Sequence, residues 1–163
     1  MDWHKHIRPY DDKDLDEILD LSILAWAPIF ASFHQVLGAE LDAILHPDWE
    51  ASQREVVETT VTESEGIETW VAEVDGDAVG FVAYQCDDES KRGEIVLLAV
   101  HPEHQDRGIG TALNDLALAK MTEAGMEIAI VETGGDASHA PARRSYEKAG
   151  FTLFPIARYF KAL

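Results

Sequence analysis

The feature that most constrains the fold lies between Glu94 and Leu113, where a strand pattern changes into a helix pattern across a short turn. The apolar run that ends at Val100 stops at Pro102, and the chain continues as Gln-Asp-Arg-Gly-Ile-Gly over residues 105–110. Helix N-termini expose backbone N–H groups that have no intrahelical partner, and glycines allow a ligand to approach them closely. The stretch therefore predicts a strand, a turn and a helix whose first amides bind an anionic group such as a diphosphate.

Two common phosphate-binding motifs do not fit this turn. A P-loop needs Lys followed by Ser or Thr where the chain has Thr111 and Ala112. A dinucleotide-binding turn needs a third glycine where the chain has Leu113. A Gly-x-Gly sequence alone is common, so its weight comes from its position between a buried strand and an amphipathic helix.

The N-terminal third of the chain shows mainly helical periodicity. The alternation over Trp3–Arg8 predicts a short first strand. The segment Asp14–Glu17 resembles a capping box that opens a helix. Pro28 interrupts the helical pattern, which predicts a break followed by a short helix or loop that ends near Gly38. A further helix is predicted over residues 48–61.

From Glu68 onward the apolar period changes to two, which is typical of strands. Two strands, Thr69–Val74 and Ala78–Asp87, are joined through Asp75-Gly76, a dipeptide that tolerates positive φ and favours a hairpin. The remaining predicted elements are a strand over 94–100, a helix from 108 to about 125, a strand over 128–133, a helix over 142–149 closed by Gly150, and two last strands over 151–160 divided near Pro155.

These elements predict an α/β fold of the α+β type, built as a single domain over residues 1–163. We expect a mixed, mostly antiparallel sheet flanked by helices, with one central β-α-β crossover. The length of 163 residues, of which 46% are hydrophobic, suits one domain with its own core.

The charge balance is strongly acidic, with 31 Asp and Glu against 13 Lys and Arg and a net charge of −18. Such a field disfavours nucleic acid and anionic membranes as partners and attracts cationic ligands. Two explanations stay open. The charge either serves solubility or adaptation to a salty cytoplasm, or it attracts an amine electrostatically. There is no apolar stretch of about 18 residues and no secretory pattern, and Cys86 is the single cysteine, so we expect a cytoplasmic protein.

Three segments occur in the order and spacing of a known family. The first is Val100–Glu103 followed by Gln105–Leu113, the second is Ala142–Phe151, and the third is the hairpin around Val74–Phe81. In these segments the chain resembles the GNAT superfamily of coenzyme A dependent N-acetyltransferases. The resemblance covers about residues 68–160. Residues 1–65, the part that selects the acceptor in this family, show only a loose likeness.

The resemblance implies that the protein transfers an acetyl group from acetyl-CoA to a primary amine, by direct attack in a ternary complex and without a metal. A small-molecule amine is the favoured acceptor. His139 stands where many members carry an asparagine seven residues before a tyrosine, which makes it a candidate for contacting the cofactor arm. The other residues implied to hold acetyl-CoA are Leu98, Ala99, Val100, Gln105, Asp106, Arg107, Gly108, Ile109, Gly110 and Thr111.

The resemblance also implies two catalytic side chains. Glu94 stands where histone acetyltransferase relatives carry a general base, and Tyr146 is the expected proton donor to the leaving sulfur. Alternatives stay open for both, because Glu94 can be a solvent-facing strand residue beside a catalytic water and Tyr146 a buried helix aromatic. A non-catalytic acyl-CoA sensor, or an enzyme that acetylates a protein N-terminus or lysine, is the alternative function.

Aromatic residues in the N-terminal third are candidates for the acceptor site. Trp26, Phe30 and Phe33 would wall an amine pocket, although core packing explains aromatics at this spacing equally well. His101 and His104 have no third ligand at a recognisable spacing, so we expect no metal. An exposed edge strand near the C-terminus makes a homodimer a further expectation.

Overall fold

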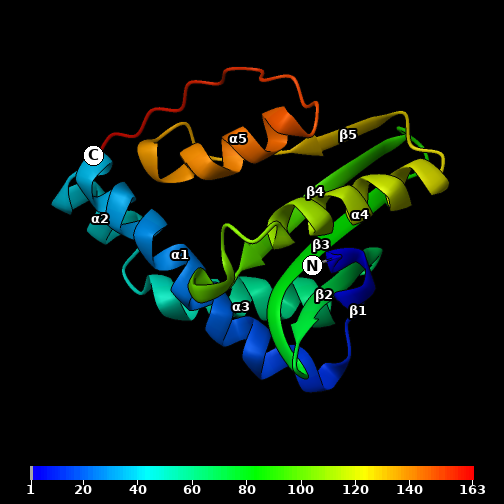
Figure 1. Cartoon of the computed structure of the whole chain (residues 1–163). Coiled ribbons are helices and arrows are strands. Elements are labelled where there is room, and N and C mark those ends of the chain that lie inside the picture. The colour runs from blue at the N-terminus through cyan, green and yellow to red at the C-terminus, as the bar shows by residue number, and fades with distance from the viewer. Residues whose placement is uncertain (1) are drawn as a thin grey trace.

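The computed structural model describes residues 2–163 and contains a five-stranded sheet with helices packed against it (Figure 1). The strands lie in chain order: β1 (Ile7–Pro9), β2 (Ile67–Val74), β3 (Asp77–Asp87), β4 (Arg92–Val100) and β5 (Ile128–Val131). The pairs from β1 to β4 are antiparallel, whereas β4 and β5 are parallel and joined through α4 (Ile109–Glu123). The predicted fold class, a mostly antiparallel sheet flanked by helices with one β-α-β crossover, is confirmed, but the crossover lies at the edge of the sheet and not at its centre as expected.

Neighbouring residues of β3 belong to two separate hydrophobic clusters, one on each face of the sheet. Phe81 packs in a cluster with residues of α1 (Leu15–Leu37) and α3 (Trp49–Thr62). Val82, the next residue, packs in the other cluster with residues of α4. Because side chains alternate along a strand, α4 lies on the face opposite α1 and α3.

Local turn signals in the sequence correspond to the observed turns. The hairpin between β2 and β3 turns at Asp75 and Gly76, whose φ values are 54° and 99°. Gly108 precedes α4 with φ of 87°, and Gly150 follows α5 (Ala140–Lys148) with φ of 95°. These left-handed conformations favour glycine, so the predicted hairpin and the predicted start and end of these helices are confirmed.

The predicted break at Pro28 is wrong, because α1 is one continuous helix of 23 residues that contains Pro28 in its interior. A proline removes only the hydrogen bond to the carbonyl four residues earlier, here that of Leu24. Leu24 is 48% exposed and Pro28 is exposed as well, so the missing bond lies on the solvent side where water can replace it. The helix ends at Gly38 as predicted, and a short helix that the sequence did not predict, α2 (Ala39–Leu45), follows.

The predicted first strand is only partly correct, because a 3-10 turn, η1 (Trp3–His6), occupies most of it before the short β1. The predicted capping box is also shifted along the chain. Asp11 and Asp14 form the capping box of a short 3-10 turn that leads into α1. Glu17 instead accepts a hydrogen bond of 2.6 Å from the backbone N–H of Ala78, which ties α1 to the start of β3.

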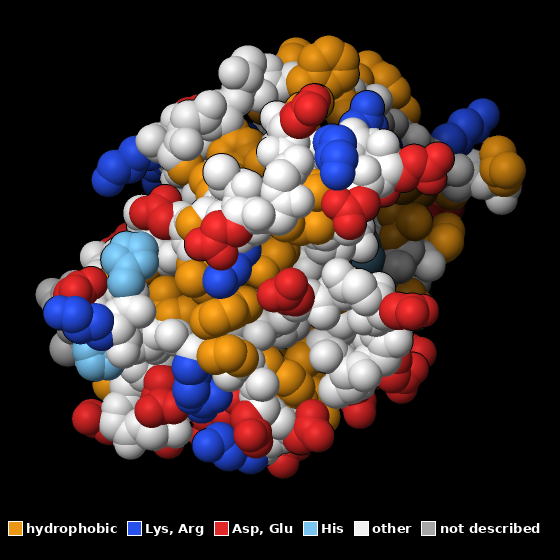
Figure 2. All heavy atoms as spheres, turned by 90° about the vertical axis from the view of Figure 1, so that its right-hand side faces the viewer, with side chains coloured by type: hydrophobic (Ala, Val, Ile, Leu, Met, Phe, Trp, Pro, Cys, Tyr) orange, Lys and Arg blue, Asp and Glu red, His pale blue; other side chains and the backbone are white. Residues whose placement is uncertain are grey.

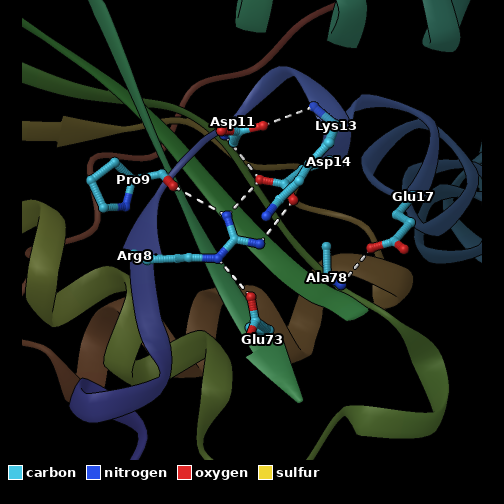
Figure 3. A network of polar contacts seen from close by, with 8 residues as sticks. All are labelled: Arg8, Pro9, Asp11, Lys13, Asp14, Glu17, Glu73 and Ala78. Carbon is cyan, nitrogen blue, oxygen red and sulfur yellow. Dashed lines mark hydrogen bonds and ion pairs between the residues drawn. The ribbon is translucent and has the colours of Figure 1, made fainter. Parts of the chain in front are cut away.

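A polar network around Arg8 joins β1 to β2 and to the start of α1 (Figure 3). The Arg8 guanidinium donates hydrogen bonds of 2.6 and 2.8 Å to the two carboxylate oxygens of Asp14, and one of 2.6 Å to Glu73. Asp14 is 3% exposed. The hydrogen bonds from Arg8 hold the pKa of the Asp14 carboxyl below its usual value, and those to Asp14 raise the pKa of Arg8. The network is therefore a structural ion pair.

The two strands predicted over residues 151–160 are wrong, because residues 151–163 form neither helix nor strand in the structure (Figure 1). Most of their large apolar side chains face solvent, with Leu153 63%, Phe154 81%, Ile156 74% and Tyr159 91% exposed, whereas Phe151 packs against the core. Apolar alternation is a local preference, whereas a strand needs a partner for its backbone hydrogen bonds. As a result β5 is the last strand of the sheet, and the crossover lies at its edge.

Acidic side chains dominate the charged surface. Figure 2 shows them spread across one side of the molecule among fewer Lys and Arg side chains and several apolar areas. With a net charge of −18, such a surface attracts cations.

Across residues 2–163, no helix combines the length and the apolarity that a bilayer crossing requires. In the same part of the chain, no group of three or more His, Cys, Asp or Glu side chains is placed to hold a metal ion.

Candidate functional site

The candidate site begins where β4 separates from β5. β4 pairs with β3 as far as Val100, but its pairing with β5 ends at Ile95. A β-bulge follows at once, because Ile95 and Leu97 pair with consecutive residues of β3 and leave Val96 as the extra residue. From Val96 to Val100, the edge of β4 that faced β5 therefore has no strand partner. The predicted cofactor-binding residues 98–100 lie on this open edge.

The turn after β4 leads into a helix N-terminus with exposed amides. Asp106 and Gly108 have left-handed backbones, with φ values of 59° and 87°. α4 starts at Ile109 without a side-chain cap, and its first backbone hydrogen bond runs from Ala112 N–H to Gly108 O at 3.0 Å. The N–H groups of residues 109–111 consequently have no intrahelical acceptor, which is the arrangement that can bind an anion at a helix N-terminus.

Two contacts bring this turn close to the open edge of β4. The Gln105 amide Nε2 donates a hydrogen bond of 3.0 Å to the carbonyl of Val100. A Cβ at Gly110 would lie 3.7 Å from the Val100 side chain and 3.9 Å from that of Leu98. The side chain of Gln105 therefore holds the turn in place, while the backbone amides of residues 109–111 remain available for a ligand.

The two predicted catalytic residues lie on β4 and α5. Glu94 is partly buried, immediately before the end of the β5 pairing, and its Oε2 accepts a hydrogen bond of 2.9 Å from Gln85 Nε2. Burial raises the pKa of the Tyr146 phenol, and its ring packs edge-on against Phe151 with centroids 5.8 Å apart. The Tyr146 phenol is thus protonated at neutral pH, and Glu94 lies just before the open edge of β4.

An aromatic cluster joins α1 to the segments before α3 and α5. Phe30 stacks on Trp49 with ring centroids 4.5 Å apart and meets Phe33 edge-on at 5.5 Å. Phe33 stacks on both His46, at 5.3 Å, and His139, at 5.8 Å. The structure therefore brings together Phe30, Phe33 and His139, three residues that the sequence singled out separately.

Asp136 holds His139 in this position. It accepts a hydrogen bond of 2.6 Å from Ser32 on α1 and a shorter one from Ser138, and its Oδ1 lies 2.5 Å from His139 Nδ1. Burial raises the pKa of the Asp136 carboxyl, but the hydrogen bonds from Ser138, Ser32 and His139 outweigh it and hold this pKa well below its usual range. Arg143 donates to two carbonyls of the same loop, so its guanidinium is engaged there.

The membership of the aromatic cluster differs from the one expected from the sequence. Trp26 is partly buried and packs against the core cluster that contains Phe81, outside the aromatic cluster. Neither His46, which precedes the predicted helix over 48–61, nor Trp49, which lies on its apolar side, was expected to belong to the site. Sequence analysis also missed Asp136, for which the N-cap pattern Asp-x-Ser over 136–138 was the available signal.

Comparisons with known proteins find similar acetyltransferases. The model of the Acetyltransferase (GNAT) family matches residues 30–151. The mycothiol acetyltransferase of Sanguibacter keddieii is 41% identical over 87 residues, which cover 50% of this chain and 27% of that protein. The N-alpha-acetyltransferase of Sulfurisphaera tokodaii is 32% identical over 104 residues, which cover 57% of this chain and 61% of that protein.

Among solved structures, the PaiA N-acetyltransferase of Thermoplasma acidophilum in complex with coenzyme A superimposes with a TM-score of 0.73. The sequence identity is 18%, and the match covers 93% of this chain and 91% of that one. At this identity the likeness concerns the fold alone. The match to the Sanguibacter protein reaches only 27% of its length, so the likeness concerns one part of that longer protein.

Proposed function

The chain belongs to the GNAT family of acetyltransferases, and we propose that it transfers the acetyl group of acetyl-CoA to a primary amine, with a small molecule as acceptor. One observation carries this proposal. The open edge of β4, which starts at Val96, is followed by the turn over residues 101–108 and then by the uncapped start of α4 at Ile109. Unpaired backbone groups at the strand edge and at the helix start therefore suit an extended ligand that ends in an anionic diphosphate.

The residues of the open β4 edge and of the start of α4 fit acetyl-CoA. The N–H groups of residues 108–111 bind the diphosphate, where the helix dipole also favours negative charge. The open edge at residues 98–100 pairs with the amides of the pantetheine arm and donates to the thioester carbonyl. When bound, acetyl-CoA supplies an acetyl group that is already activated as a thioester.

Glu94 supplies the base in this proposal. An alkylamine has a pKa near 10.4, so presenting it uncharged at neutral pH costs about 4.6 kcal/mol. Glu94, or a water that it holds, takes the proton as the amine nitrogen forms its bond to the carbonyl carbon. The N–H groups of the open β4 edge then stabilise the negative charge on the carbonyl oxygen.

Tyr146 supplies the acid. When the carbon–sulfur bond breaks, the Tyr146 hydroxyl donates its proton to the sulfur and the amide product forms. From ordinary pKa values, about 10 for a phenol and 8.5 for a thiol, this transfer is uphill by about 2 kcal/mol. Burial raises the pKa of Tyr146 further, so the phenol is protonated before the reaction and positioning must offset the unfavourable transfer.

The aromatic cluster with Phe30 and Phe33 forms an apolar wall of the acceptor pocket in this proposal, and Trp26 lies on the same helix. The acidic surface supports a cationic amine as acceptor, because it raises the local concentration of such a substrate. A protein N-terminus is the second candidate acceptor, since one relative is named an N-alpha-acetyltransferase.

The test is release of free thiol from acetyl-CoA in the presence of amines, measured with a colorimetric thiol reagent. The panel includes small polyamines, aminosugars, peptides with free N-termini, and N-acetylated peptides that contain lysine. We expect the highest kcat/KM with a small cationic amine. A preference for free peptide N-termini would replace the small-molecule acceptor by a protein, and CoA binding without thiol release from any amine would indicate a non-catalytic acyl-CoA sensor.

We also propose that two copies associate through residues 151–163, whose apolar side chains are exposed. Leu153, Phe154 and Ile156 are each more than 60% exposed, and soluble proteins rarely leave such a run uncovered. Sedimentation equilibrium is expected to give a dimer for the wild type and a monomer for Phe154→Ser combined with Ile156→Ser. A monomeric wild type would contradict this proposal.

A further inference from the structure

The N-terminal segment contacts the diphosphate-binding turn through Trp3. The indole Nε1 of Trp3 donates a hydrogen bond of 2.6 Å to the carbonyl of Arg107, although the two residues are 104 positions apart. Trp3 is only 8% exposed and packs in the same core cluster as Ile109 and Leu113 of α4. Its ring lies beside Gly108, where a Cβ would be 3.7 Å from the Trp3 Cδ1 atom.

This hydrogen bond fixes one peptide unit of the turn. In a trans peptide the C=O and the following N–H point in opposite directions. Among residues 2–163 no peptide bond is cis. Because the carbonyl of Arg107 points at Trp3, the N–H of Gly108 in the same peptide unit points away from Trp3. Both neighbours of Arg107, namely Asp106 and Gly108, have left-handed backbones, a conformation that persists where surrounding contacts hold it.

The side-chain contacts of residues 104–107 do not involve this peptide unit. Gln105 bonds through its side-chain amide to Val100, and the Arg107 guanidinium lies 3.1 Å from His104 Nδ1. On the side of Trp3, a hollow of about 280 Å³ borders Gly108 and the first turn of α4. Trp3 therefore holds the Arg107–Gly108 peptide through its hydrogen bond, on the side of the turn where the hollow lies.

We propose that Trp3 is a positioning residue for binding of the acetyl-CoA diphosphate. Through the Arg107 carbonyl it orients the Gly108 N–H, and with it the start of α4, toward the anion. The inference rests on the proposed function, because the anion is the diphosphate of that co-substrate. In this proposal Trp3 acts on the cofactor site through the Arg107–Gly108 peptide, and no atom of Trp3 needs to touch the cofactor.

The test compares Trp3→Phe with Trp70→Phe in the full chain. Phe keeps an aromatic ring in the core but lacks the N–H donor, and Trp70 packs against the same core cluster, which makes it a matched control. For Trp3→Phe we expect the Kd for CoA and the KM for acetyl-CoA to rise three- to tenfold, with kcat changed less than twofold. The KM for S-acetylpantetheine, a donor without a diphosphate, is expected to stay at the wild-type value, and Trp70→Phe is expected to change none of these constants.

The outcomes separate this inference from the proposed function. Absence of CoA binding by the folded wild type would overturn the proposed function and the inference with it. Wild-type binding together with unchanged CoA affinity in Trp3→Phe would overturn the role of Trp3 alone. Equal losses for acetyl-CoA and S-acetylpantetheine would show a merely structural role and would also overturn it.

A measurement on the wild type covers the case in which Trp3→Phe does not fold. The indole N–H resonance of Trp3 is expected to shift when CoA is added, because the Arg107 carbonyl that it binds belongs to the turn that takes up the diphosphate. Addition of S-acetylpantetheine is expected to leave this resonance in place. A Trp3 resonance that CoA does not move would contradict the inference.

Discussion

Arg8 and Asp14 form a two-pronged ion pair, in which two guanidinium nitrogens donate to the two carboxylate oxygens at 2.6 and 2.8 Å. The Asp14 side chain is 3% exposed and that of Arg8 is 28% exposed. The pair fastens the first strand to the start of α1, at the point where the chain passes from the sheet to the helix layer. Its geometry is the bidentate arrangement that gives arginine pairs their strength.

Replacing Arg8 by Met is expected to lower the free energy of unfolding by about 3 kcal/mol, because it leaves a buried carboxylate without its partner. The measurement is equilibrium unfolding in urea. Lys5→Met is the control, since its ion pair with Asp2 is exposed and is worth less than about 0.5 kcal/mol. Similar losses for the two variants would contradict the structural importance of the Arg8 pair.

The same pair predicts a dependence of stability on pH. Arg8 lowers the pKa of Asp14 in the folded protein, whereas in the unfolded chain an aspartate titrates near 3.9. The stabilisation is therefore present above that value and is lost as the pH falls through the lower folded pKa. Unfolding free energies measured between pH 7 and pH 3 are expected to decrease less steeply on acidification for Asp14→Asn than for the wild type. Parallel curves would show that Asp14 has the same pKa in both states.

Tyr146→Phe is expected to lower kcat by about 100-fold and to leave the KM for acetyl-CoA within about threefold, because the variant lacks only the proton donor. Steady-state thiol release gives both constants. Tyr159→Phe is the control, since Tyr159 is 91% exposed and no catalytic role is proposed for it. Wild-type turnover in Tyr146→Phe would remove Tyr146 as the acid.

Asp136 connects α1 to the segment before α5 through Ser32 and His139. Asp136→Ala is expected to lower the free energy of unfolding by about 2 kcal/mol, because it leaves these two partially buried groups without their acceptor. In combination with Ser32→Ala the losses are expected to be less than additive, which a double-mutant cycle in urea measures. Additive losses would mean that Ser32 and Asp136 stabilise the fold independently. Asp20→Asn, at an exposed ion pair on α1, serves as the control.

Asn114 on α4 is 1% exposed, and neither polar atom of its side chain has a hydrogen-bond partner in the described structure. It lies one helical turn after Gly110, on the face of α4 that packs against the end of β4. Asn114→Leu is expected to raise the free energy of unfolding by about 1 kcal/mol without ligand, because an unpaired buried amide is removed.

Equilibrium unfolding of the two proteins in urea, without ligand, measures this difference. A variant that is less stable than the wild type would contradict this account of Asn114.

Turns and helix starts that depend only on neighbouring residues could be predicted from the amino-acid sequence. Asp75-Gly76 supplies the positive φ values that a tight hairpin needs, and Gly150 supplies the one that follows α5. The change of apolar period at Gly108 determined that a strand is followed by a helix with free amides, and hence that this turn suits an anion. Local conformation and periodicity are properties of neighbouring residues, so they can be inferred without a partner.

Features that depend on contacts between distant segments could be seen only in the folded structure. α1 passes through Pro28 because the missing hydrogen bond faces solvent, and residues 151–160 form no strand because β5 gives them no pairing partner in the sheet. The contacts of Trp3 with Arg107 and of Phe33 with His139 join residues more than 100 positions apart. No local pattern encodes such pairs, because burial and hydrogen bonding between them arise only when the sheet and its helices pack together.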